Sequence, residues 1–149
     1  MTEVIGLDHV YITVQELARS EIFYDRVLLG CMGFRKNKFT LGSDPHIQYF
    51  NRHLGYVLRS SRSQTPIDPF APGLHHLCFR VDSVADVVEV ASQLCTSGIA
   101  ASEAKRYPEY AVDYWATYFC DPDGIQLEVT NYRIERRDRH DNWYPDISD

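Results

Sequence analysis

Residues 6–14 read Gly-Leu-Asp-His-Val-Tyr-Ile-Thr-Val, and residues 73–81 read Gly-Leu-His-His-Leu-Cys-Phe-Arg-Val. The second stretch repeats the first, so that His9 aligns with His76. A histidine that occupies the same place in two copies of one unit can bring two imidazoles to one point. Two imidazoles at one point suggest a metal site.

The composition is that of a globular protein and excludes two classes of partner. A length of 149 residues is enough for one domain with a buried core. A net charge of −6 argues against nucleic-acid binding, and no apolar run approaches the roughly 18 residues of a membrane span. The N-terminus lacks the pattern of an export signal, so we expect a cytoplasmic protein. The four cysteines have no CxxC spacing, and we expect them to be reduced and mostly buried.

Each copy begins with a predicted strand followed by a predicted helix. Residues 7–14 alternate between a face that carries His9 and an aliphatic face, which is typical of a half-buried strand. Residues 76–81 alternate in the same way. Apolar residues then recur at helical spacing in residues 17–29 and 84–95. In both copies the aliphatic face can pack on the helix while the histidine points the other way.

Short strand patterns complete each unit. They cover residues 34–40, 47–51 and 55–60 in the first copy, and residues 100–105, 114–120 and 125–131 in the second. The sequence therefore predicts an α+β fold of two tandem βαβββ modules within a single domain, residues 1–149. The modules cover about residues 5–62 and 72–131 and are joined by a proline-rich linker, residues 63–71. The charged tail 132–149 is expected to be poorly ordered and docked through Trp143 and Tyr144.

The last predicted strand supplies a third candidate ligand. Its apolar residues alternate with Gln126, Glu128 and Thr130, so Glu128 is expected to face the same interior as His9 and His76. Two imidazoles and one carboxylate with open positions form the facial triad suited to Fe(II), and Mn(II), Ni(II) or Zn(II) can take the same ligands.

Each of these residues also has a purely structural interpretation. A strand histidine on its own is more often structural or exposed than a ligand, and Glu128 on its own is more often an exposed charge. His75 competes with His76, and the alignment of the repeat favours His76. The joint placement of all three on corresponding faces is what favours metal binding.

Three passages resemble the vicinal oxygen chelate superfamily, which includes glyoxalase I, fosfomycin-resistance proteins, bleomycin-resistance proteins and extradiol dioxygenases. The passages are residues 7–10 with the helix that contains Phe23-Tyr24, residues 76–81, and Asp121-Pro122-Asp123-Gly124-Ile125-Gln126-Leu127-Glu128. The resemblance covers roughly residues 5–131. It implies paired βαβββ modules that form an open cup-shaped sheet around a divalent metal, usually in a homodimer.

One position departs from the glyoxalase I pattern. That subfamily is expected to place a second glutamate ligand in the first-half strand that matches the Glu128 strand. Aligning Gly55 with Gly124 puts Arg59 opposite Glu128. A cation cannot ligate a metal, although it can pair with an anionic substrate. The interpretation of Arg59 as a solvated strand end stays open.

The resemblance implies an enzyme whose substrate is chelated by the metal through vicinal oxygens. Tyr11 shares the His9 face and can donate a hydrogen bond to a bound oxygen, or can simply pack. Tyr114 and Tyr118 lie in or beside a strand that can line the cup, and they are candidate substrate-binding residues together with Arg59. Glu128 is the one general base that the sequence suggests. Lyase and dioxygenase chemistry both remain open.

Two alternatives accompany this prediction. A non-catalytic protein of the bleomycin-resistance type would sequester a small molecule, and that class generally lacks the triad. A partner-recruiting protein would use the charged tail 132–149.

Overall fold

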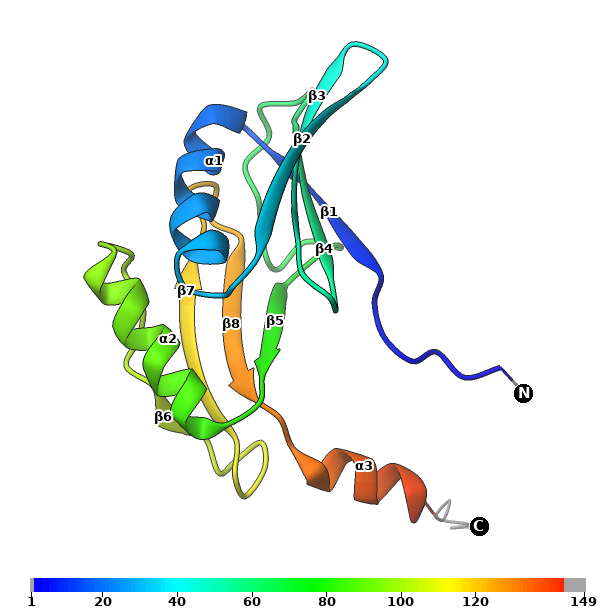
Figure 1. The fold of residues 1–149 in the computed structure, drawn as a ribbon, viewed down its shortest axis with the longest axis vertical. Helices are drawn as coiled ribbons and strands as arrows, with labels where there is room; N and C mark the ends of the chain where they lie inside the picture. Colours follow the sequence, from blue (N-terminus) through cyan, green and yellow to red (C-terminus); the bar gives the residue numbers. More distant parts are fainter. Residues whose placement is uncertain (1, 144–149) are drawn as a thin grey trace.

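The computed structural model describes residues 2–143, which fold into two modules that follow one another along the chain (Figure 1). The first module consists of β1 (His9–Val14), α1 (Leu17–Tyr24), a π-helical turn (Asp25–Leu29), β2 (Arg35–Leu41), β3 (Asp44–Phe50) and β4 (Gly55–Ser60). The second consists of β5 (His76–Val81), α2 (Val84–Thr96), β6 (Lys105–Arg106), β7 (Trp115–Cys120) and β8 (Gln126–Asn131), and it is followed by α3 (Ile134–Asp141).

The two modules have the same sheet topology. The strand order is β1-β4-β3-β2 in the first sheet and β5-β8-β7-β6 in the second. In each sheet the first strand is parallel to the last strand of its module, and the remaining pairs are antiparallel. A parallel pair requires a crossover, which α1 and α2 provide. The predicted α+β fold of two βαβββ modules is therefore confirmed.

The modules share one hydrophobic core. The ring of Phe23 on α1 lies 6.4 Å from that of Phe119 on β7. Tyr56 on β4 lies 5.8 Å from Phe79 on β5. All four residues are buried. Because side chains alternate along a strand, the residues between these core positions point to the opposite, outer face of each sheet. His9 and Glu128 are on these outer faces.

A buried hydrogen-bond chain also joins the modules. The hydroxyls of Tyr24 and Tyr56 lie 2.8 Å apart, and the Tyr24 hydroxyl donates to Asp121 Oδ2 at 2.9 Å. The other Asp121 oxygen accepts from the backbone N–H groups of Asp123 and Ile125, which fixes the turn before β8. Burial raises the pKa of Asp121 and that of Tyr24. The turn of the second module is thus held by a phenol of the first.

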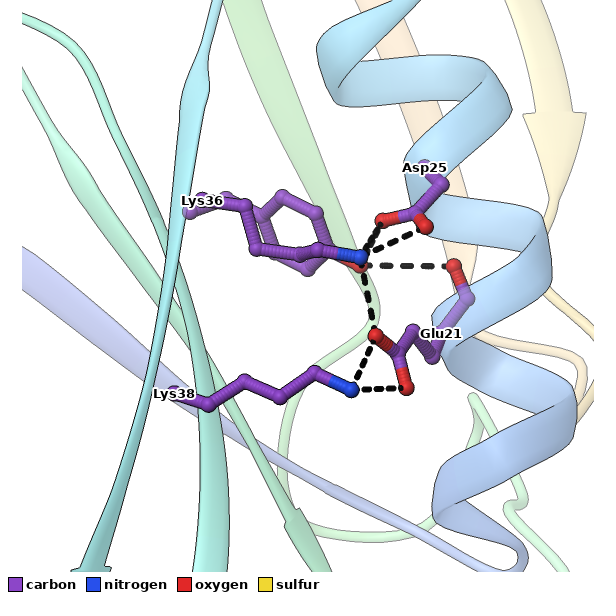
Figure 2. A network of polar contacts seen from close by, with 5 residues as sticks. Glu21, Asp25, Lys36 and Lys38 are labelled. Atoms are coloured by element: carbon purple, nitrogen blue, oxygen red, sulfur yellow. Dashed lines mark hydrogen bonds and ion pairs between the residues drawn. The ribbon is translucent and has the colours of Figure 1, made fainter.

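An ion-pair network ties α1 to β2 (Figure 2). Lys36 Nζ lies 2.8 Å from Glu21 Oε1 and 2.7 Å from Asp25 Oδ2, and Lys38 Nζ lies 2.6 Å from the same Glu21 oxygen. The hydrogen bonds from Lys36 and Lys38 lower the pKa of Glu21 below its usual value. The network stabilises the packing of α1 against β2.

Local sequence signals account for the helix and turn ends. Ser83 and Asp86 form a capping box at the start of α2, with reciprocal side-chain to backbone hydrogen bonds. Gly98 and Gly124 have φ values of 75° and 89°, a region that favours glycine, at the end of α2 and in the turn before β8.

Three expectations from the sequence are wrong in detail. Residues 100–105 do not form a full strand, since only Lys105–Arg106 and an isolated bridge at Ala101 pair there. The described part of the tail is not irregular, because residues 134–141 form α3, which extends away from the sheets (Figure 1). Trp143 does not dock, being 71% exposed, and Tyr144 lies outside the described residues.

The cysteines differ from the expectation in their burial. All four are free thiols, as expected, but Cys78, Cys95 and Cys120 are exposed. Among residues 2–143, no helix is long and apolar enough to cross a membrane.

Candidate metal centre

Two of the three predicted ligands meet on the outer face of the second sheet. The parallel register of β5 and β8 places Cys78 beside Glu128. His76 lies two residues before Cys78 on β5 and therefore on the same face. His76 Nε2 lies 3.4 Å from Glu128 Oε2. The side chain of His76 remains 43% exposed, so a ligand can still reach this pair.

The Glu128 carboxylate is almost fully buried, with 2% of its surface exposed. The Tyr114 hydroxyl donates a hydrogen bond to Glu128 Oε1. Tyr118 lies directly across the β7–β8 pair on the same face. A buried carboxylate is costly unless donors or a cation compensate it. A cation bound at Glu128 would offset this cost.

The neighbours of Glu128 respond to this charge. Burial, followed by the hydrogen bond and charge of Glu128, raises the pKa of Tyr114 well above its usual value. Burial and the Glu128 charge raise the pKa of Tyr118 in the same way. Although the Cys78 residue as a whole is exposed, burial of its sulfur and the same carboxylate raise the pKa of the thiol to about 12. These three groups thus keep their protons at neutral pH, and Tyr114 donates its proton in a hydrogen bond to Glu128.

The third predicted ligand, His9, lies on the outer face of the first sheet. Its Nδ1 is 2.7 Å from Asp8 Oδ2, which holds the ring and leaves Nε2 available. Tyr11 packs edge-on against His9, with ring centroids 5.6 Å apart. Gly55 is the strand neighbour of His9, and a Cβ added there would lie 3.0 Å from His9 Cβ. Glycine at this position gives the imidazole its space.

The sequence analysis missed His46, which belongs to the same surface. His46 is only 4% exposed, stacks on Phe39 with ring centroids 5.0 Å apart, and meets Tyr11 edge-on at 5.9 Å. Its Nδ1 donates to the Asp44 carbonyl at 2.9 Å, since a carbonyl can only accept. His9, Tyr11, His46 and Phe39 form a row of rings from β1 to β2. The alternation of side-chain direction along β3, aligned with that along β4, was the sequence signal that could have placed His46 on this surface.

The triad is not assembled within one chain. Across residues 2–143, no group of three His, Cys, Asp or Glu side chains is close enough to hold a metal ion. The two modules meet through the buried faces that their helices cover, with Phe23 of α1 near Phe119 and Tyr56 near Phe79, and the faces that carry His9 and Glu128 lie opposite these contacts. His76 and Glu128 are brought together, whereas His9 is kept apart from them.

The register corrects the position matched to Glu128. His9 pairs with Gly55 and His76 pairs with Gln126, so the structural equivalent of Glu128 is Val57. The predicted match to Arg59 is therefore wrong, because Gly55 and Gly124 do not occupy equivalent places. Position 57 still offers no carboxylate, so the absence of a first-half glutamate ligand holds.

The predicted substrate-binding residues lie on both sheets. Tyr114 and Tyr118 border Glu128. Arg59 lies on the outer face of the first sheet, where its guanidinium is 3.1 Å from Asp44 Oδ2. Asp44 therefore already neutralises part of the Arg59 charge that the sequence analysis suggested for pairing with an anionic substrate.

The donor set fits a divalent metal. An imidazole nitrogen and a carboxylate oxygen that bind the same ion at about 2.1 Å each lie about 3 Å apart. The separation of 3.4 Å between His76 and Glu128 is close to that value. One further imidazole with the accessibility of His9 would complete a facial triad.

The sequence matches a known family over most of its length. Residues 6–129 match the family model of the Glyoxalase/Bleomycin resistance protein/Dioxygenase superfamily. Among curated proteins, the chain has no match.

Solved structures share the fold. A glyoxylase/bleomycin resistance protein/dioxygenase domain from Frankia sp. EAN1pec is 25% identical, with a TM-score of 0.71 over 88% of this chain and 100% of that chain. The fosfomycin resistance protein FosX from Listeria monocytogenes is 16% identical, with a TM-score of 0.63 over 91% and 99%. A lactoylglutathione lyase from Agrobacterium tumefaciens is 21% identical, with a TM-score of 0.60 over 87% and 94%. The last two similarities concern the fold alone, which is the vicinal oxygen chelate fold.

Proposed function

Because the chain belongs to the glyoxalase/bleomycin resistance protein/dioxygenase superfamily, we propose that it is a divalent-metal-dependent enzyme that acts on a small oxygenated substrate. His76 and Glu128 of one copy hold the metal together with His9 of a second copy. Fe(II) is the first candidate, and Mn(II), Ni(II) and Zn(II) are alternatives.

One observation carries this proposal: a buried carboxylate lies 3.4 Å from an accessible imidazole on the face that the repeat predicts. Three protein ligands leave two or three coordination positions, enough for two vicinal oxygens of a substrate. When bound, the metal supplies Lewis-acid stabilisation of a substrate oxyanion or a place for O2 beside the substrate. Lyase and dioxygenase chemistry are both compatible with this ligand set.

The protein's own residues orient the substrate and supply protons. Tyr114 donates to Glu128 Oε1 and thereby fixes the carboxylate. Tyr11, which is 44% exposed beside His9, is placed to donate a hydrogen bond to a substrate oxygen.

The proposal requires a homodimer. The outer face of one first sheet must meet the outer face of the other copy's second sheet, because the shared core keeps the two faces of one chain apart. A two-fold dimer satisfies this requirement twice and forms two equivalent sites.

Metal uptake tests the proposed function. Protein purified without added metal, soaked in Fe(II), Mn(II), Ni(II) or Zn(II) and then desalted, is expected to hold about one equivalent of at least one metal per chain. Glu128→Gln and His76→Ala are expected to abolish uptake. His53→Ala is the matched control, since this exposed histidine lies in the β3–β4 turn. Wild-type protein with less than about a tenth of an equivalent contradicts the proposal and favours a sequestering protein of the bleomycin-resistance type.

A further inference from the structure

Four tyrosines form one connected cluster on the outer face of the second sheet. Tyr107 meets Tyr118 edge-on at 5.5 Å and stacks on Tyr110 at 5.9 Å with a 20° angle between the rings. Tyr110 in turn meets Tyr114 edge-on at 5.3 Å. We call these four residues the tyrosine wall. Tyr114 and Tyr118 border Glu128, and Tyr107 and Tyr110 extend the wall beyond the proposed metal site.

The loop that carries the wall is held by its own hydrogen bonds. Tyr107 N–H donates to the Tyr114 carbonyl at 2.7 Å, and Tyr110 N–H donates to the Tyr107 carbonyl at 3.1 Å. Arg106 Nε donates to the Val112 carbonyl at 2.6 Å. The rings are therefore positioned before any ligand arrives, and binding does not have to order them.

The outer part of the wall stays in contact with water. Tyr110 is 60% exposed, although its ring is stacked and its backbone is fixed. A rigid, exposed aromatic surface beside a polar site is the usual composition of a binding pocket wall. The hydrophobic core of the protein does not use Tyr110.

Two cations flank the wall. Lys105 Nζ lies 5.0 Å from the centre of the Tyr107 ring, and the Arg133 guanidinium lies 4.5 Å from that of Tyr114. Within the described range, residues 2–143, neither side chain forms an ion pair. The wall therefore offers π faces together with two positive charges that are free to meet an anion.

We propose that the tyrosine wall, with Lys105 and Arg133, binds the planar aromatic ring of a ligand that carries an anionic substituent. This inference deepens the proposed function, because such a ligand would lie with its oxygens toward Glu128 and its ring against Tyr110. It assigns a role to Tyr107 and Tyr110, which the metal site does not require.

The first test uses metal-free protein and benzoate, so it does not depend on metal binding. Benzoate is titrated while the tyrosine ring signals are followed by NMR. Saturable shifts are expected at Tyr107 and Tyr110 in wild type, and the shift at Tyr107 is expected to disappear in Tyr110→Ser. Tyr110→Phe keeps the ring and is expected to retain the shift at Tyr107. Val112→Ser is a control on the same loop, since Val112 is 78% exposed and outside the wall.

The second test links the wall to the metal. Acetohydroxamate and benzohydroxamate present the same vicinal-oxygen chelating group and differ by the aromatic ring. By calorimetry on Zn(II)-loaded protein, benzohydroxamate is expected to bind roughly two- to twelvefold more tightly, the range of one aromatic contact. A 4-carboxylate on the ring is expected to add a further gain that Arg133→Gln removes. Tyr110→Ser is expected to erase the preference for the ring.

The outcomes separate the two proposals. If no Zn(II) is bound, hydroxamate binding disappears while the benzoate shifts remain, and only the metal proposal is wrong. If benzoate gives no saturable shifts, or if Tyr110→Ser binds it as well as wild type, the ring-binding inference is wrong. A change from dimer to monomer in Tyr110→Ser, measured by light scattering, would also overturn it, because the wall would then be a protein interface.

Discussion

A metal site shared between two copies can be tested by distributing two substitutions over a heterodimer. His9→Ala removes the imidazole of the first sheet, and Glu128→Gln removes the carboxylate of the second while keeping its size. Both residues lie on outer faces, so neither change opens a cavity in the shared core. In the proposed homodimer, each variant alone has two sites that both lack a ligand.

The proposed two-fold arrangement sets the expected stoichiometry. In a heterodimer of the two variants, one site combines an intact His9 with an intact Glu128, and the other combines both substitutions. The heterodimer is therefore expected to hold about half an equivalent of metal per chain, whereas wild type holds about one and each separate variant almost none.

The assay is metal analysis of a heterodimer purified through two different tags. The matched control carries both substitutions on one chain and pairs it with a wild-type chain. There, each site loses one ligand, and uptake is expected to be close to zero. The same two substitutions thus give opposite results according to their distribution.

A reversed pattern would refute the reasoning. If the doubly substituted chain paired with wild type holds about half an equivalent and the mixed heterodimer holds none, the three ligands come from one chain. Circular dichroism of each variant shows that the loss of metal is not a loss of fold.

Three further predictions concern stability and the space around His9. Tyr24→Phe is expected to cost about 2 kcal/mol in urea unfolding, and Tyr56→Phe about 1, because the first breaks two buried hydrogen bonds and the second one; equal costs would contradict this order. Glu21→Gln is expected to cost about 1 kcal/mol at pH 7. Since the folded pKa of Glu21 lies below its ordinary value of 4.5, its stabilisation is complete above that value and is lost as pH falls through the folded pKa; a difference from wild type that stays constant into strong acid would refute this. Gly55→Ala is expected to cost about 1–2 kcal/mol and to weaken metal binding, since its methyl group would meet His9 Cβ at 3.0 Å; an unchanged melting curve and metal affinity would show that His9 has room to move.

The fold could be predicted from the sequence because its signals are local. The alternation around His9 and around His76 identified two strands and their outer faces. Ser83 marked the start of α2, and the Asp-Pro-Asp-Gly turn marked the start of β8. The same alternation placed Glu128 on the face of His76, where the structure has it.

Errors arose where pairing between strands decides the outcome. Arg59 was matched to Glu128 from two glycines, but Gly55 lies within a parallel pair and Gly124 within a turn. The register puts Val57 at that place. His46 escaped notice because its role depends on Tyr11 and Phe39, which come from other strands.

The sequence by itself determined two βαβββ modules, each with an aliphatic face and a face that carries chemistry. Only the tertiary structure decided that the two modules bury their helix-covered faces in one core, through contacts such as those of Phe23 on α1 with Phe119 and of Tyr56 with Phe79. Alternation requires that an aliphatic face be buried but does not specify against which module. Packing of core side chains makes that choice, and it keeps His9 away from Glu128 within one chain.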